Sequence, residues 1–577
     1  MYLRKCNRRK DGKTHSYWAL VESYRTERGP RQRIVSWLGE LDESGRLGIK
    51  QAAEGREEYQ KELFNAAEPE WVEVNVREVK VGRAVDFGAP WLGKQLISLL
   101  GLDKLFEKYT ERGREEIAWS AMMELLILSR FCEPSSELHI AEHFFEHTAL
   151  GDILGLPVAK VNDDRLYRAL DKLLPHKDEL EKHLKERIGS LFNITYDLFL
   201  YDVTSTYFEG NAKGMPLAQH GYSRDHRRDC KQVCIGLVVS RCGFPLGYEL
   251  FAGNRSDSTT VDEIVSKMET KYGKAERVWV MDRGMANEHN FDILRSEGRK
   301  YIVGAKRAEL KKYTKELLSD DWKKVRAGVE AKVVDTPDGK ETFILCRSAD
   351  RKQRDNAIFE QFVNRIESGL QEILESCKKR NYSVNVIERR IGRLLQKNSR
   401  AAAIFEIQVT QNDGKTSIQW LQKPNHLDWH ILSSGCYILR SNIKDWSEEE
   451  LWKAYVQLAE AESAFRIHKS DLSIRPIWHR KEDRVSAHIL VCFLAFVLWK
   501  TLAALCKKAG LGDEPRKVLY ELSQIKLVEV ILPTRKNINI KLRCVSTPTE
   551  HQKILLQKLN LKPPKRLQKN SLVVTTF

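Results

Sequence analysis

Between residues 195 and 310, short apolar runs alternate with amphipathic stretches. The runs have the length and composition of β-strands and lie at 198–208, 233–240, 246–251, 277–281 and 300–306. A capped segment beginning at Thr259 predicts a helix before the fourth strand, and a second helix separates the fourth strand from the fifth. Three antiparallel strands, a helix, a strand, a helix and a strand is the order of the RNase H-like fold. We therefore predict an α/β protein with an RNase H-like core.

The chain before this core has two other patterns. Ser16–Tyr24 and Gln32–Leu38 alternate like strands around the turn-forming Arg28-Gly-Pro, which predicts a small basic β unit over residues 1–50. Helical periodicity then dominates residues 51–190, for example at Ile117–Leu128.

The predicted core is interrupted and then resumes. Residues 311–433 carry the hairpin signals Thr336-Pro-Asp-Gly and Gln411-Asn-Asp-Gly, with a long charged helical stretch between them. We expect a mixed, mainly β insertion there. The strand starting at Cys436 would return to the core, whose second part, with an acidic helix, covers 434–510. A basic C-terminal region covers 511–577.

Composition adds a candidate partner. Of the 577 residues 42% are hydrophobic and 31% charged, which is typical of a soluble globular chain of several domains, and the net charge is +16. The excess lies at the ends: residues 1–50 carry twelve Lys or Arg against six Asp or Glu, and residues 501–577 carry fifteen against five. Such basic ends favour a polyanion such as nucleic acid, but a solubilising surface charge explains them equally well.

Cysteine use and hydropathy bear on the compartment. The eleven cysteines are scattered and no signal peptide follows Met1, so we expect reduced thiols and a cytoplasmic protein. The most apolar segment, Ile489–Trp499, is too short to span a bilayer. It predicts a buried helix within 487–505 and no membrane partner.

Three carboxylates stand in informative settings. Asp202 lies inside an apolar strand, Asp282 ends another, and Glu462 lies on a helical stretch that begins near Glu448. A carboxylate within an apolar strand is costly to bury unless a cation neutralises it. Two strand carboxylates and one from a helix can hold two magnesium ions about 4 Å apart, the arrangement that drives phosphodiester chemistry. Taken singly, Asp282 could be a strand exit and Glu462 a solvated helix position.

The spacing on the acidic helix selects Glu462 among its neighbours. Glu460 lies about 200° around a helix from Glu462, so both cannot face the same metals. Tyr455, Glu462 and Lys469 are each seven residues apart and would share one face.

This pattern resembles the DDE transposases of bacterial insertion sequences. It is similar to the insertion-sequence-four superfamily, whose helix carries Tyr-x2-Arg-x3-Glu-x6-Lys and whose core is interrupted by a β insertion before the Glu. The resemblance covers about 195–310 and 435–495 and implies a transposase that binds terminal inverted repeats, cleaves the element ends and joins them to target DNA. It implies Asp202, Asp282 and Glu462 as catalytic and metal-binding residues with two Mg²⁺ or Mn²⁺ ions. It also implies a helical DNA-binding region at 51–190, a homodimer in the DNA complex, and association with the nucleoid.

The chain departs from this signature at one position. Leu458 stands where the family has an arginine that helps to grip the DNA end. In this chain either another residue grips the DNA end or that contact is absent. Arg466 and Arg475 are the candidates for the replacement.

Other basic residues are candidate DNA contacts. Tyr455 could stack on a base or bond a phosphate, and Lys469 could place its charge on a phosphate. The run 224–231 contributes Arg224, Arg227 and Arg228, and Arg475 follows the acidic helix. A solvated basic loop explains the run almost as well.

Two other functions remain open. The chain could be a nuclease or domesticated relative that hydrolyses DNA but does not join ends. It could also be a DNA-binding regulator in which the carboxylates are structural.

Overall fold

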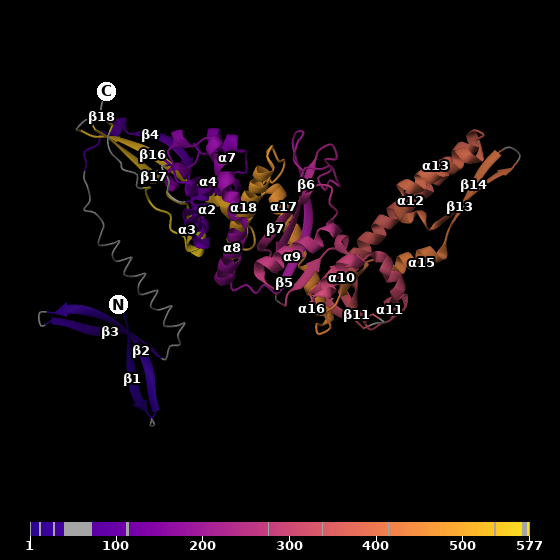
Figure 1. Cartoon of the computed structure of the whole chain (residues 1–577), viewed down its shortest axis with the longest axis horizontal. Coiled ribbons are helices and arrows are strands. Elements are labelled where there is room, and N and C mark those ends of the chain that lie inside the picture. The colour runs from indigo at the N-terminus through magenta and orange to yellow at the C-terminus, as the bar shows by residue number, and fades with distance from the viewer. Residues whose placement is uncertain are drawn as a thin grey trace. The chain divides into compact units, whose positions relative to one another are not determined.

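The computed structural model (Figure 1) describes residues 2–10, 13–26, 29–39, 72–110, 115–274, 276–336, 339–412, 415–535, 538–567 and 574–575. The chain divides into two compact units. One consists of Met1–Lys80, Ile531–Lys541 and Ser571–Phe577, and the other of Val81–Val530 and Leu542–Asn570.

The first unit contains an antiparallel meander. Its strands are β1 (Tyr2–Lys10), β2 (Lys13–Thr26) and β3 (Gly29–Gly39), and they pair in chain order. The two predicted strands are confirmed as β2 and β3, and β1 is an addition that the alternating pattern did not reveal. The predicted turn at residue 28 and the positions 40–71 lie outside the described residues.

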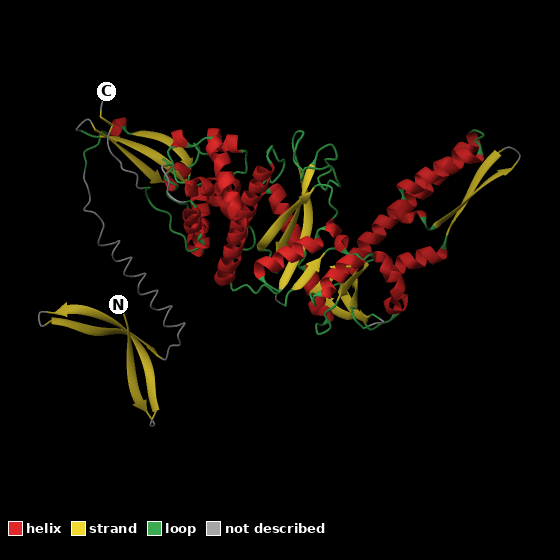
Figure 2. Ribbon diagram, viewed as in Figure 1, coloured by secondary structure: helices red, strands yellow, loops and turns green. Residues whose placement is uncertain are grey.

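A nine-stranded mixed sheet organises the second unit. Its order is β10-β11-β12-β15-β9-β8-β5-β6-β7. The strands are β5 (Leu198–Tyr207), β6 (Gln232–Val239), β7 (Pro245–Ala252), β8 (Val278–Met281), β9 (Lys300–Gly304), β10 (Lys323–Arg326), β11 (Val329–Asp335), β12 (Thr342–Ser348) and β15 (Cys436–Ser441). All five predicted core strands are confirmed, and the predicted returning strand is β15, which pairs antiparallel with β9. The sequence runs are apolar because helices cover both faces of this sheet (Figure 2).

Strand pairing fixes what lies next to what in the sheet. β5 pairs antiparallel with β6, and β6 pairs antiparallel with β7. β5 pairs parallel with β8, and β8 parallel with β9. The chain therefore crosses over between β7 and β8 and between β8 and β9 through helices α9 (Val261–Tyr272) and α10 (Glu288–Ser296).

The two faces of the sheet belong to different hydrophobic clusters. Leu200 of β5 packs in the cluster that contains Ala461 and Ala464 of α17 (Ala459–Ser470). Its neighbour Tyr201 packs in the cluster formed with α9 and α10. Because side chains alternate along a strand, even-numbered positions of β5 face α17.

Helices also build the region before the core. They are α2 (Gly88–Leu100), α3 (Leu102–Tyr109), α4 (Trp119–Cys132), α5 (Glu137–His139), α6 (Leu150–Ile153), α7 (Asp163–Leu173) and α8 (Lys177–Phe192). A short helix, α11 (Thr314–Leu318), opens the insertion, and the helices after the insertion include α16 (Glu448–Val456), α18 (Glu482–Lys508), α19 (Pro515–Ser523) and α20 (Glu550–Lys558). The remaining strands are β4 (Lys80–Asp86), β16 (Lys526–Pro533), β17 (Ile538–Val545) and β18 (Val574–Thr575).

The predicted buried helix is α18. Within the described residues it alone is long and apolar enough to span a bilayer, with a window of mean hydropathy 2.4, and 83% of that window is buried in the protein. Its side chains are apolar on all sides because it packs against helices α4 and α7 and against β7. It is the central helix of the largest core cluster.

The insertion differs from the expectation of a mainly β segment. β10, β11 and β12 extend the central sheet, and the segment after them is mainly helical: α12 (Ala349–Lys379), α13 (Val384–Lys397), α14 (Ser399–Ala402) and α15 (Pro424–Ser433), with one hairpin of β13 (Phe405–Asn412) and β14 (Lys415–Gln422). The reason is the spacing of Ile366, Leu370, Ile373 and Cys377, which gives α12 one buried stripe against α13 and the hairpin. This helical arm has its own small core.

Burial of α18 predicts a large stability effect. Phe496 is fully buried in α18, so Phe496→Ala should lower the free energy of unfolding by about 3–5 kcal/mol through the lost apolar contacts and the cavity left behind. Denaturant unfolding measures this change. Leu318→Ala, at a side chain that is 67% exposed, is the control and should change stability little. Equal losses of stability in the two variants would contradict the assignment of α18 as a buried core helix.

Candidate active site

Asp202 sits near the middle of β5 and is partly buried. As an even-numbered residue it shares the face of Leu200, the face that α17 covers. Its Oδ1 accepts a hydrogen bond of 2.8 Å from the N–H of Val203. No Lys or Arg forms an ion pair with it among the described residues, so a carboxylate enclosed by apolar strand residues lacks a direct counter-charge there.

Asp282 follows β8 directly and begins the short helix η6 (Arg283–Met285). The parallel register pairs Tyr201 with Met281 as its last partners, so Asp202 and Asp282 are the next residues along two adjacent strands. Asp282 is exposed, which suits a group at the mouth of the site.

The electrostatics of Asp202 reflect this arrangement. Burial raises the pKa of its carboxyl to about 7, and the negative charges of Asp282 and Asp257 add to the rise. The Val203 N–H and the positive charge of Arg224 oppose it. A bound cation would act in the same sense as these opposing groups, by favouring the ionised form.

Glu462 lies in the first turn of α17 and is exposed. The helix residues near it, Ala461 and Ala464, pack on the Asp202 face of the sheet. Within the described chain Glu462 has no ion-pair partner. By contrast, Glu460 pairs with Nζ of Lys500 at 3.2 Å.

The acidic helical stretch is broken, whereas the sequence suggested one continuous helix. α16 ends at Val456 and α17 begins at Ala459. The turn between them is tightened, because the N–H groups of Leu458 and Ala461 bond to carbonyls three residues earlier. Tyr455 therefore belongs to a different helix from Glu462 and Lys469.

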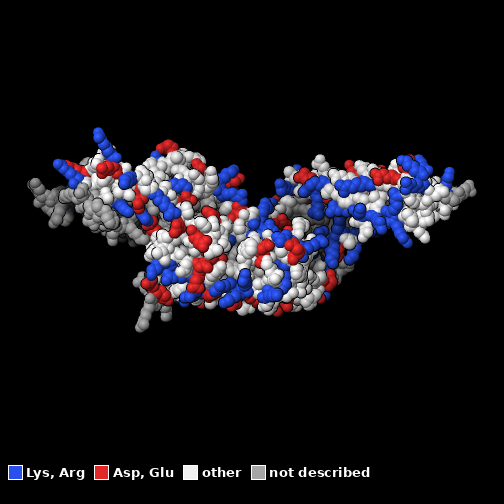
Figure 3. Space-filling view, turned by 90° about the horizontal axis from the view of Figure 1, so that it is seen from above, with Lys and Arg blue, Asp and Glu red and all other residues white. Residues whose placement is uncertain are grey.

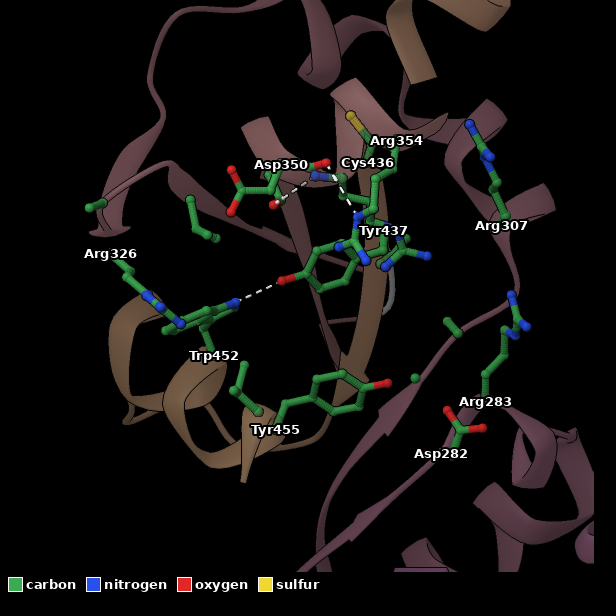
Figure 4. Close-up of a pocket in the computed structure, with 18 residues that line it drawn as sticks. Asp282, Arg283, Arg307, Arg326, Asp350, Arg354, Cys436, Tyr437, Trp452 and Tyr455 are labelled. Carbon is green, nitrogen blue, oxygen red and sulfur yellow. Dashed lines mark hydrogen bonds between the residues drawn. The ribbon is translucent and has the colours of Figure 1, made fainter. Parts of the chain in front are cut away.

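Tyr455 lines a pocket together with Asp282 (Figure 4). Burial raises the pKa of its hydroxyl, and the charge of Asp282 adds to the rise. Gly304 permits this approach, since a Cβ at that position would lie 2.6 Å from the Tyr455 oxygen.

Leu458, the departure from the signature, is buried in the main core. The helix break turns this position inward, so a leucine there stabilises the junction of α16 and α17. An arginine side chain could not occupy that environment without a buried partner.

Lys469 and Arg475 meet on one buried carboxylate. Nζ of Lys469 lies 2.8 Å from Oδ1 of Asp225, and Arg475 forms an ion pair with the same oxygen. The other oxygen, Oδ2, is buried with no hydrogen-bond partner among the described residues. Burial lowers the pKa of Lys469, and Asp225 opposes that shift.

The basic run after β5 is partly held in place. Arg224 forms an ion pair with Asp257, and Arg227 bonds to Asp229. Arg228 is exposed. Arg224 is thereby fixed beside the strand that carries Asp202, while Arg227 and Arg228 remain at the surface.

Among the described residues, one set of three potential metal ligands lies within 4.8 Å, and it is Glu137, His479 and His488, away from the three carboxylates. Nδ1 of His488 lies 3.5 Å from the Arg130 guanidinium, and its Nε2 lies 3.2 Å from the carbonyl of Ile474. Both ring nitrogens are thus engaged, and a guanidinium beside them disfavours a cation. This set is a buried polar network. The oxygens of Asp202, Asp282 and Glu462 do not all lie within 4.8 Å of one another.

Comparison with protein families identifies the catalytic region. The model described as "Transposase DDE domain" matches residues 194–498, more than half of the chain, and the match includes Asp202, Asp282 and Glu462. The chain belongs to the DDE transposases. It is therefore a DNA transposase, a metal-dependent enzyme that cuts and moves DNA.

A second model, "IS1634 family transposase, N-terminal domain", matches residues 3–69 of this transposase. None of the curated proteins matches the chain. Among solved structures, a cryo-EM structure of a piggyBac transposase synaptic complex with hairpin DNA is similar, with a TM-score of 0.34 and 8% identity over 77% of this chain and 82% of that chain. The assignment to the DDE transposases rests on the family match over residues 194–498.

Asp225 and Asp257 are residues of the candidate site that sequence reasoning did not single out. Asp225 stands inside the basic run, between Arg224 and His226, where an acid among basic residues was a signal for an internal partner. Asp257 carried no such signal, because its pairing with Arg224 depends on the fold.

The Asp225 cluster yields a test of local stability. Asp225→Ala would leave Lys469 and Arg475 facing each other without their shared carboxylate. Because removing one partner of a buried ion pair is costly, the free energy of unfolding should fall by on the order of 3 kcal/mol. Asp229→Ala, which removes an exposed carboxylate from the same loop, should have little effect. Thermal or denaturant unfolding measures both variants. An unchanged free energy of unfolding in Asp225→Ala would contradict the buried contact of Asp225 with Lys469 and Arg475.

Proposed function

We propose that this transposase binds the terminal inverted repeats of an insertion sequence, cleaves the element ends and joins them to target DNA. Asp202, Asp282 and Glu462 are its catalytic carboxylates. The observation that carries the proposal is the parallel register of β5 and β8, which makes Asp202 and Asp282 neighbours on the side of the sheet that α17 covers.

The donor set fits two hard divalent cations, Mg²⁺ or Mn²⁺. All three side chains offer oxygen, which these ions prefer, and none has an ion-pair partner in the part of the chain that is described. The raised pKa of Asp202 supports the same fit, because burial and neighbouring acids disfavour its charged form until a cation compensates. Bound there, the ions would supply an activated oxygen nucleophile and stabilise the leaving oxygen.

The surrounding basic groups orient the DNA. Asp225 holds Lys469 and Arg475 in fixed positions on one side of the sheet end, and Asp257 holds Arg224. Each of these three basic side chains keeps N–H groups that can donate hydrogen bonds to a backbone phosphate. Arg227, Arg228 and Tyr455 extend these contacts.

The finer classification is also a proposal. The order β7-β6-β5-β8-β9, in which β5 pairs antiparallel with β6 on one side and parallel with β8 on the other, supports an RNase H-like core. The interruption before Glu462 and the Tyr455, Glu462 and Lys469 spacing support the insertion-sequence-four group. We assign repeat recognition to the helical region before the core, and a homodimer to the DNA complex because two ends must be held together.

Neutral variants of the three carboxylates test the assignment. Asp202→Asn, Asp282→Asn and Glu462→Gln should each reduce cleavage of DNA carrying the element ends by more than about a hundredfold, because a metal ligand is lost. DNA binding should persist. Asp202→Asn should also keep or raise thermal stability, since it removes a charge whose burial costs free energy. Gel-based cleavage and mobility-shift assays with Mg²⁺ or Mn²⁺ measure the activity and the binding.

Glu460→Gln is the matched control on the same helix, two residues from Glu462, and should retain cleavage. Chelation of divalent cations should abolish cleavage in the unaltered protein, and Mg²⁺ should restore it. Pre-cut ends supplied to the protein should be joined to target DNA. Retained cleavage in Glu462→Gln would refute its role, and cleavage without joining would favour a hydrolysis-only enzyme.

A further inference from the structure

A strongly basic pocket opens next to Asp282. Its volume is about 470 Å³. Five arginines line it, and they come from segments far apart in the sequence: Arg283 after β8, Arg307 after β9, Arg326 at the end of β10, and Arg351 and Arg354 on α12. The central sheet and the first turns of the helical arm thus build it together.

Most of these arginines lack a counter-charge among the described residues. Arg307 lies 3.8 Å from a carboxylate oxygen of Asp355 and donates to the carbonyl oxygen of Ser433 at 2.9 Å. The other four form no ion pair in the described part of the chain. The pocket carries two acids, Asp282 and Asp350, so positive charge is in excess. Guanidinium groups gathered in this way repel one another unless an anion lies between them.

Aromatic side chains give the pocket a firm wall. Nε1–H of Trp452 donates to the hydroxyl of Tyr437 at 2.7 Å, and the guanidinium of Arg351 lies 5.0 Å from the centre of the Tyr437 ring. Figure 4 shows Arg326 and Asp282 on opposite sides, with Tyr437, Trp452 and Tyr455 between them. Arg351 is therefore held against this aromatic wall.

The size and charge of the pocket identify the ligand class. Guanidinium groups match phosphate oxygens in geometry, and several of them side by side fit consecutive phosphates. A volume of about 470 Å³ is that of a small-molecule site, which is too small to enclose a DNA duplex. The pocket accommodates part of one strand.

We propose that this pocket binds consecutive phosphates of a single DNA strand that continues from the catalytic centre at Asp282. The inference rests on the proposed function, since it takes Asp282 as part of that centre. Figure 3 shows Lys and Arg side chains gathered over the arm and around a hollow beside it, the surface along which such a strand can run. The four arginines that form no ion pair in the described chain are the strand's contacts.

Binding to the unaltered protein provides the first test. A 5′-phosphorylated mixed-sequence oligonucleotide of about 12 nucleotides is added without divalent metal, so that no cleavage occurs. Arginine modification by phenylglyoxal is then read by mass spectrometry. Arg283, Arg326, Arg351 and Arg354 should be modified in the free protein and protected by the single strand, while Arg389 and Arg393 on α13 should stay reactive. Absence of this selective protection would overturn the proposal.

A variant pair provides the second test. Arg351→Ala/Arg354→Ala should weaken single-strand binding roughly tenfold to a hundredfold for each lost guanidinium contact. The slope of log affinity against log salt should fall by about 0.7 for each phosphate released. The control Arg389→Ala/Arg393→Ala removes the same charge from exposed positions of the same arm. Equal losses in the two pairs, or equal loss for a blunt duplex of the same sequence, would refute a pocket specific for one strand.

These outcomes are separable from the proposed chemistry. Footprinting and binding need no catalysis, so they report on the pocket even if the protein fails to cleave or join DNA. Conversely, metal-dependent cleavage lost in Glu462→Gln, together with unprotected pocket arginines, would keep the proposed function and reject the strand site.

Discussion

The arrangement of this site depends on one constraint: a carboxylate enclosed in an apolar strand needs a positive partner, and the described residues do not supply one at contact distance. Asp202 is that carboxylate. The parallel pairing of β5 with β8 places Asp282 beside it, and this second negative charge further disfavours the ionised form of Asp202. Alternation along β5 then directs Asp202 toward α17 and away from α9 and α10. Such a pair of acids adds nothing to stability by itself, and this is the basis for our proposal that the two carboxylates bind a cation together.

The helical arm extends the core without disturbing this geometry. It leaves the sheet after β12 and returns at β15, and these two strands are hydrogen-bonded neighbours. The ends of the insertion are therefore already held together, and a long excursion between them adds little to the entropy cost of closing the chain. The arm is stabilised by its own cluster around Ile366 and Leu370. The sheet keeps its register, and α12 can carry Arg351 and Arg354 to the edge of the site.

Elements and candidate residues could be predicted from the sequence where the local pattern agrees with burial in the fold. The runs around Asp202 and Asp282 are apolar on both faces, and only a covered sheet requires that, so strands and acids could be located together. The break at Leu458 could not be found, because the residues on both sides favour helix and only packing of Leu458 into the core selects the tight turn. The helical arm was misjudged because hairpin signals near Thr336 and Gln411 are strong locally, although one of them belongs to the central sheet. Pairs such as Arg224 with Asp257 arise from tertiary contact alone.

Charge is separated in this site rather than neutralised. Asp282 and Arg283 are consecutive in the chain and both line the arginine pocket, yet they form no ion pair in the described structure. Had the acids and the arginines faced each other, they would have formed internal salt bridges and left nothing for a metal or a phosphate. Because Asp282 and the pocket arginines form no ion pairs with one another among the described residues, the carboxylate remains available to a cation and the guanidinium groups to an anion. In the proposed reaction a metal–phosphate substrate complex would carry both missing charges, so its binding would satisfy the acids and the arginines at once.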